Sequence, residues 1–178
     1  MNVTLRAPEL SDIDFLMETE NNDEAYANGT VATGPYSRYQ LERYVKESTN
    51  DIYTDLQLRL MIMVDGEAAG IIDLFDFNPR HRRAEVGVFV AKRFRQRAVA
   101  SKALNILENH CFRNLGIHQL YAYIREDNEA CLRLFRKAGF KQTGKLTDWV
   151  STHDGYKDVY IMQHVGATLA VARTNRKL

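Results

Sequence analysis

The hydrophobic periodicity of this 178-residue chain changes near Val90, and the change limits the fold more than any other feature. Over 58–90, apolar residues alternate with polar ones in three runs, and the turn pair Asp65-Gly66 joins two of them, as in a β-hairpin. Beyond Val90, two stretches have helical spacing, with an alternating run at 119–124 between them. Antiparallel strands followed by strand, helix, strand, helix and strand predict an α/β domain with a mixed sheet (α+β).

The two ends of the chain extend this pattern. Val3–Arg6 is a predicted strand, and Ser11-Asp-Ile-Asp14 is a variant capping box that would open a helix to about Glu20. We expect one domain over 1–166 and a basic tail over 167–178. Further expected elements are a loop or broken helix at Asn21–Tyr36, a helix at Ser37–Ser48, and strands at Lys141–Val150 and Tyr156–Val165.

Composition narrows the class of protein. Hydrophobic residues make up 45% of the chain and charged residues 26%, as in globular proteins. The sequence shows no apolar run near the ~20 residues of a membrane span and no signal-peptide pattern, so no membrane partner is expected. The two cysteines, Cys111 and Cys131, cannot make a disulfide framework, which favours the cytoplasm. A net charge of +1 argues against a nucleic-acid partner.

A short basic loop precedes the first helix that follows Val90. Arg93, Arg95 and Arg97 flank small residues where a helix begins. The unpaired amides of a helix start and the positive end of its dipole attract phosphate, and arginine donates two parallel hydrogen bonds to it. The alternative interpretation is an ordinary helix start with a solvated basic loop.

The order of several motifs resembles that of the GNAT superfamily of N-acetyltransferases. Arg95-Gln-Arg-Ala-Val-Ala100 resembles the family's acyl-CoA pyrophosphate loop, and Asn128–Phe140 is similar to its Asn-to-Gly-Phe helix segment. The resemblance covers about Val3 to Val165 and is greatest to spermidine and ribosomal-protein N-terminal acetyltransferases. It implies about six to seven mostly antiparallel strands, about four helices, and a central splay between the strands Val86–Val90 and Gln119–Ile124.

The resemblance also implies acetyl-CoA as co-substrate. The pantetheine arm would lie in the splay and the pyrophosphate would bind at the helix start, where glycines of the family's loop are replaced by Gln96 and Ala98. Glycine tolerates backbone conformations that other residues avoid. Alanine still allows a close approach if these residues keep negative φ, so we expect weaker binding rather than none. The cofactor-binding residues implied are Val88, Phe89, Val90, Arg95, Gln96, Arg97, Ala98, Val99, Ala100, Ser101, Asn128, Phe135 and Lys137.

The tyrosine with which family members protonate the leaving thiolate is Phe135 here. The candidate base is Glu85, unless it merely pairs with Arg82 or Arg83. Asp73 is the second candidate, unless it is a plain edge residue of the sheet. General acid catalysis contributes about 10²–10⁴-fold, so its loss slows the reaction without forbidding it. Substitute acids would be Tyr123 and Tyr156, then Tyr160 and Cys131, all of which could instead be structural; no histidine spacing indicates zinc.

The predicted function is transfer of an acetyl group from acetyl-CoA to a primary amine by direct attack in a ternary complex. The acceptor would be a small amine, a polyamine or a protein N-terminus. The alternative is a catalytically weak CoA-binding module with a regulatory or scaffolding role, which Phe135 motivates. The tail and the final strand are candidates for a homodimer contact.

Overall fold

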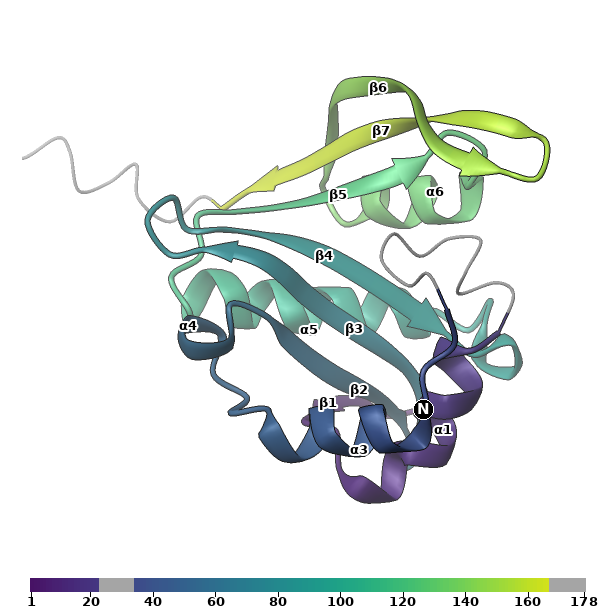
Figure 1. The fold of residues 1–178 in the computed structure, drawn as a ribbon. Helices are drawn as coiled ribbons and strands as arrows, with labels where there is room; N and C mark the ends of the chain where they lie inside the picture. The colour runs from purple at the N-terminus through teal and green to yellow at the C-terminus, as the bar shows by residue number, and fades with distance from the viewer. Residues whose placement is uncertain (23–33, 167–178) are drawn as a thin grey trace, which may run out of the picture.

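A single twisted sheet organises the molecule (Figure 1). The computed structural model describes residues 1–22 and 34–166, whose seven strands lie in the order β1-β2-β3-β4-β5-β7-β6. Neighbours are antiparallel except β4 and β5, which are parallel. The strands are β1 (Val3–Arg6), β2 (Leu58–Val64), β3 (Glu67–Asn78), β4 (Arg83–Val90), β5 (Gln119–Arg125), β6 (Lys141–Thr152) and β7 (Gly155–Val165).

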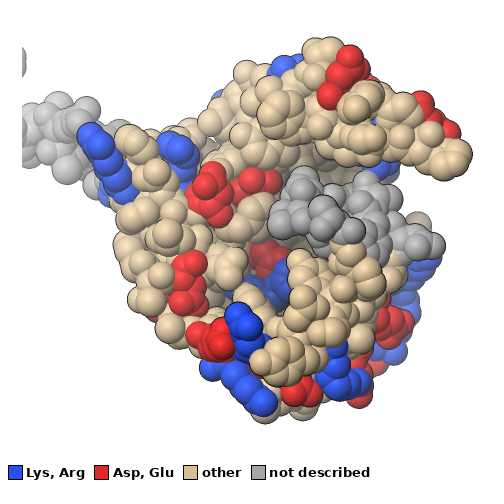
Figure 2. Space-filling model, in the orientation of Figure 1, with Lys and Arg blue, Asp and Glu red and all other residues tan. Residues whose placement is uncertain are grey.

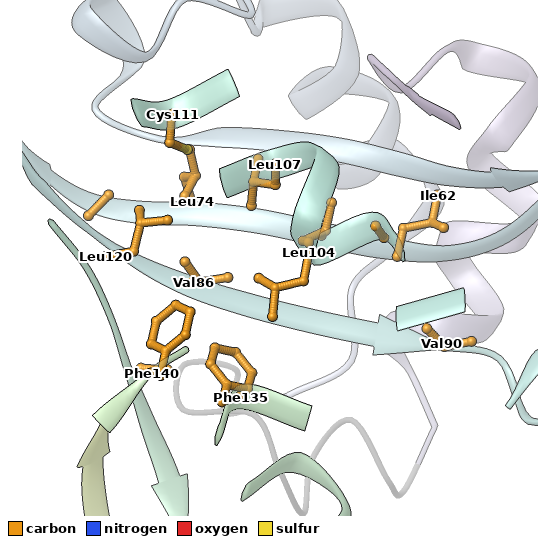
Figure 3. Packing of buried hydrophobic residues seen from close by; sticks show 14 of the residues in the cluster. Ile62, Leu74, Val86, Val90, Leu104, Leu107, Cys111, Leu120, Phe135 and Phe140 are labelled. Atoms are coloured by element: carbon orange, nitrogen blue, oxygen red, sulfur yellow. The ribbon is translucent and has the colours of Figure 1, made fainter. Parts of the chain in front are cut away.

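Helices cover both faces of this sheet. Leu104 and Leu107 of α5 pack against Leu74 and Val86 in the main core, which α6 also joins (Figure 3). On the opposite face, α1 and α3 bury a second cluster around Met61. The helices are α1 (Ile13–Glu20), α3 (Arg38–Glu47), α4 (Ile52–Asp55), α5 (Val99–Arg113) and α6 (Glu129–Lys137), with 3-10 turns η1 (Leu10–Asp12) and η2 (Lys92–Phe94).

The structure confirms the predicted mixed sheet and most of its elements. Asp65 and Gly66 both have positive φ, 49° and 89°, as the hairpin turn requires. Ser37 and Gln40 form a capping box at α3, the predicted helix, whereas α4 was not predicted. No helix within 1–22 or 34–166 is long and apolar enough to cross a membrane.

The capping box predicted at Ser11-Asp-Ile-Asp14 is wrong. The box lies two residues earlier, between Glu9 and Asp12, and opens η1, which runs into α1. Asp12 is buried and its carboxylate binds the Arg6 guanidinium at 2.6 Å, which fixes it at this position. The expected loop at Asn21–Tyr36 falls largely, and the basic tail 167–178 wholly, outside the described residues.

Candidate active site

The strands β4 and β5 part after a short shared stretch. Their register joins only Arg83 to Gln119, Ala84 to Leu120 and Glu85 to Tyr121, and Figure 1 shows them diverging from there. The rest of β4 pairs with β3 alone. The splay implied by the family resemblance is therefore present, and Val88, Phe89 and Val90 lie along it.

Two aromatic rings fill the core beside the divergence. Phe135 of α6 packs edge-on against Phe140 with ring centres 4.8 Å apart, in the same cluster as Val86 and Leu120 (Figure 3). The Phe135 side chain is 1% exposed. Where the family resemblance implies a tyrosine that protonates the leaving thiolate, this chain thus has a buried apolar ring. The ring stabilises the core and has no proton to donate.

The loop before α5 adopts a conformation that the sequence analysis did not expect. Gln96 and Ala98 have φ of 60° and 58°, so the condition of negative φ, under which a close approach was expected, is not met. The buried side chains of Phe94 and Val99 fix the two ends of the loop, and the backbone between them turns sharply through the left-handed region. These residues adopt the conformation that glycine favours, without being glycine.

The start of α5 presents its backbone amides without a side-chain cap. Ala98 is the N-cap residue, and the first helical hydrogen bond runs from the Lys102 amide to the Ala98 carbonyl, at 3.0 Å. The amides of Val99, Ala100 and Ser101 precede that bond and have no acceptor within the helix. This arrangement suits the pyrophosphate that the loop was predicted to bind.

The three arginines of the loop differ in their contacts. Arg95 donates from Nε to the Val90 carbonyl at 2.7 Å, and its guanidinium lies 5.6 Å from the centre of the Phe89 ring. Arg93 pairs with Glu67 at 2.7 Å, on the side of the β2–β3 turn. Arg97 is exposed. Arg95 therefore joins the loop to the end of β4, and Arg97 extends into solvent beside the free amides.

The remaining implied cofactor residues lie on α6. The Asn128 side chain caps that helix by accepting a hydrogen bond from the Cys131 amide at 3.2 Å, which leaves its NH₂ group for a ligand. Lys137 is exposed at the last position of the helix. Asn128 precedes the first residue of α6, close to the end of β5, whereas Lys137 lies at the opposite end of the helix.

Glu85 lies where the two strands separate, on the face opposite α5. It is half-buried, and within the described residues no ion pair involves it, so the alternative that it pairs with Arg82 or Arg83 is not borne out there. Burial, and then the negative charge of Asp76, raise the pKa of Glu85 to about 7. A carboxyl with such a pKa can accept a proton near neutral pH.

Asp76 and Tyr121 complete this cluster, and the sequence analysis missed both. Asp76 has φ of 50° within a register shift between Phe75 and Asn78, and the Tyr121 hydroxyl donates to its carboxylate. Burial and this hydrogen bond raise the pKa of Tyr121, so the hydroxyl keeps its proton. An aspartate among aromatic residues was a usable signal for Asp76, since an acid is rare in an apolar strand.

A cavity of about 290 Å³ adjoins the cluster, and Figure 2 shows acidic side chains along the hollow on this face. Tyr123, a predicted acid, is 39% exposed in it, whereas Tyr156 is 65% exposed at the far end of the β6–β7 hairpin. Tyr156 lies seven residues along β7 from the partner of Tyr121, about 23 Å at 3.3 Å per residue. The lining residues are Asp76, Arg83, Gln119, Tyr121, Tyr123, Ile161 and Gln163.

Asp73, the second candidate base, already has a partner. Two hydrogen bonds of 2.9 Å join it to the Arg59 guanidinium, which also contacts Glu20 at 2.5 Å. β3 lies inside the sheet, so the alternative of a plain edge residue is wrong. Although burial opposes it, Asp73 and Glu20 raise the pKa of Arg59, which therefore stays charged and neutralises Asp73.

The other substitute acids lie in different surroundings. Burial raises the pKa of Cys131 to about 12. Tyr160 lies on β7 beneath the Lys145 ammonium, 5.9 Å from the centre of its ring. No group of three or more metal-ligating side chains occurs in the described part of the chain.

Comparisons with known proteins agree with this geometry. A family model described as an acetyltransferase (GNAT) domain matches residues 2–141. The spermidine N(1)-acetyltransferase of Escherichia coli K12 is 24% identical over 174 residues, covering 92% of this chain and 87% of its own. Vibrio cholerae spermidine N-acetyltransferase in complex with CoA and spermine is 25% identical, with a TM-score of 0.81 over 92% of this chain and 95% of its own. A dodecameric structure of that enzyme, 24% identical, has a TM-score of 0.79 over 96% and 98%.

Proposed function

The chain belongs to the GNAT acetyltransferase family, and on this premise we propose that it transfers an acetyl group from acetyl-CoA to a primary amine with Glu85 as general base. A single observation carries the proposal. Glu85 is half-buried, has no cation beside it in the described part of the chain, and lies where the opening between β4 and β5 begins. Its pKa of about 7 suits it to take a proton from an ammonium group near neutral pH.

Acetyl-CoA would occupy the splay. The β4 edge that faces away from β3 would pair with the pantetheine arm at Val88 and at the Val90 amide, since the Val90 carbonyl already accepts from Arg95, and the amides that begin α5 would bind the pyrophosphate. Bound there, acetyl-CoA supplies an activated acyl carbon. Asn128 would orient the arm through its NH₂ group.

The chain's own residues would manage the proton of the acceptor. Glu85 accepts a proton from the incoming ammonium, and the freed amine forms a C–N bond with the acetyl carbon as the C–S bond breaks. The nitrogen then gives up a second proton to solvent, and the thiolate takes one from solvent, since Phe135 has none to give. The products are an N-acetyl amine, CoA and one proton released when Glu85 ionises again.

The acidic character of this face favours a cationic acceptor. Glu85 and Asp76 lie beside the cavity, and Glu20 and Asp73 share the one guanidinium of Arg59. Carboxylates in a partly buried hollow raise the local concentration of cations. Polyamines are thus the first acceptors to test, followed by small amines and peptides with a free N-terminus.

Release of the CoA thiol, followed with a thiol reagent, tests the proposal. We expect turnover with at least one of these amines, and a loss of about 10²–10⁴-fold in kcat/KM for Glu85→Gln with CoA affinity unchanged by calorimetry. Asp154→Asn, the same loss of charge in the exposed β6–β7 turn, is the matched control. Equal kcat/KM in Glu85→Gln and wild type would reject Glu85 as the base.

A second candidate function rests on Phe135. A CoA-binding module without efficient turnover would bind acetyl-CoA in calorimetry yet release no thiol with any amine, and Phe135→Tyr would leave that result unchanged.

Three further expectations belong to the proposal. The sheet continues to Val165, which supports one domain over 1–166, and the free cysteines Cys111 and Cys131 suit the reducing cytoplasm. Self-association is the third, motivated by the dodecameric relative, and light scattering measures it.

A further inference from the structure

We propose that Asp76, held in place by the Tyr121 hydroxyl, is a positioning residue that sets the pH at which Glu85 becomes a base. The inference rests on the proposed function for its catalytic meaning. Nothing in the chemistry of acetyl transfer requires a second carboxylate next to the base.

The backbone brings the two carboxylates together. Glu85 pairs with Phe75 on β3, the residue next to Asp76, and with Tyr121 on β5, the residue bonded to Asp76. The register shift after Phe75 and the positive φ of Asp76 break the regular alternation of β3 at this residue. A bulge of this kind re-aims a side chain, and here it lets an aspartate on β3 meet a tyrosine two strands away.

The Tyr121 hydroxyl fixes the Asp76 carboxylate. It keeps its proton, because burial and the bond to Asp76 raise the pKa of Tyr121, so it remains a donor through the working pH range. Tyr121 is buried and packs edge-on against Tyr123 with ring centres 5.6 Å apart. The hydroxyl thus comes from a ring with little freedom to move.

The other charged groups around Glu85 do not replace Asp76. On β3, Asp73 lies on the same face, but Arg59 of β2 neutralises it through two hydrogen bonds. On β4, Arg83 lines the cavity without any ion pair among the described residues. Asp76 is therefore the unneutralised anion next to Glu85 in this part of the chain.

The functional consequence concerns the ammonium form of the acceptor. A base that is half-protonated near pH 7 returns its proton to water readily after each turnover, and it is ionised often enough to accept the next one. Without the charge of Asp76, Glu85 would ionise at lower pH and would be a weaker base at pH 7. Asp76 would in this way match the base to neutral pH without touching the reacting atoms.

Titration of Glu85 tests the inference directly. Carbon NMR of protein labelled at the glutamate carboxyl gives the midpoint, and Glu85→Gln assigns the signal. In Asp76→Asn we expect the midpoint to fall by roughly half a unit to one unit. Asparagine adopts positive φ as readily as aspartate, so this variant keeps the bulge. Tyr121→Phe, which frees the carboxylate but keeps its charge, should shift the midpoint less, and Asp154→Asn should not shift it.

The acid limb of kcat/KM against pH is the second measurement, because it reports the pKa of the base in the free enzyme. It should move to lower pH in Asp76→Asn by the same amount as the NMR midpoint. An unchanged midpoint in Asp76→Asn, or a larger shift in Tyr121→Phe than in Asp76→Asn, would overturn the inference. If no amine is acetylated, the proposed function fails, and the NMR titration still decides whether Asp76 controls Glu85.

Discussion

Replacing Ala98 by glycine tests the conformation of the loop that begins α5. Ala98 has φ of 58° and ψ of 16°, and a side chain in this left-handed region costs about 1–2 kcal/mol. Glycine removes that cost but makes the unfolded chain more flexible, which offsets about 0.4–1 kcal/mol. We therefore expect Ala98→Gly to raise the free energy of unfolding by about 0.5–1 kcal/mol and Tm by about 2–3 °C in a chain of this size.

A second alanine, two residues further on, supplies the control. Ala100 lies in the first turn of α5, outside the set of residues with positive φ, and packs against the core. Glycine there should lower the free energy of unfolding by about 1 kcal/mol. Urea unfolding shows whether each variant raises or lowers the free energy of unfolding, and equal m-values show that the two can be compared. If Ala98→Gly destabilises the protein as much as Ala100→Gly does, the left-handed loop and the amide site built on it are refuted.

Three further changes have defined outcomes. The pKa of Glu85 is raised in the folded protein from 4.5 to about 7, so stability is lost as pH rises through this range. Glu85→Gln should therefore raise the free energy of unfolding by about 1 kcal/mol at pH 8 and leave it unchanged at pH 4, as measured by urea titration. Phe135→Tyr adds a hydroxyl to a buried ring and should cost about 1–3 kcal/mol in the same assay, while raising kcat for CoA release about 100-fold if the hydroxyl reaches the thiolate. Arg59→Met leaves two partly buried carboxylates without their cation and should cost about 3 kcal/mol, whereas Arg43→Met, at an exposed pair, should change stability by less than about 0.5 kcal/mol.

Local chemistry made much of the fold predictable. The turn at Asp65-Gly66, the cap at Asn128 and the stop at Gly139, with φ of 95°, each depend on residues adjacent in sequence. At Gly87, inside β4, the absence of a side chain allows a close approach, since a Cβ there would meet the Phe75 ring at 2.9 Å. Such features follow from backbone sterics, which a sequence reveals directly.

The candidate site depends on contacts distant in sequence, and its prediction was correspondingly incomplete. Strand alternation places Glu85 on the face of β4 opposite Val86, but it could not choose between Tyr121 and Tyr123, which share a face of β5. Asp76 reaches the site through a bulge that interrupts alternation, and the partner of Asp73 is Arg59, on a neighbouring strand. Tyr156 was a candidate by residue type alone, and only the length of β7 shows how far from Glu85 it lies.

Acetyl transfer has two proton-transfer barriers, protonation of the leaving thiolate and deprotonation of the amine. Phe135, in place of the expected tyrosine, removes the acid that would lower the first and smaller of them. A thiol has a pKa of about 8.5, so leaving as a thiolate at pH 7 is unfavourable by about 2 kcal/mol. An amine like that of lysine, with a pKa of about 10.4, is neutral in only a few of 10⁴ molecules at pH 7, a handicap of about 4–5 kcal/mol. A chain that keeps Glu85 and the carboxylate of Asp76 retains the means to reduce the handicap of the protonated amine, which is the greater of the two. On the proposed role of Glu85, loss of the acid would therefore slow acetyl transfer by less than loss of the base would at neutral pH.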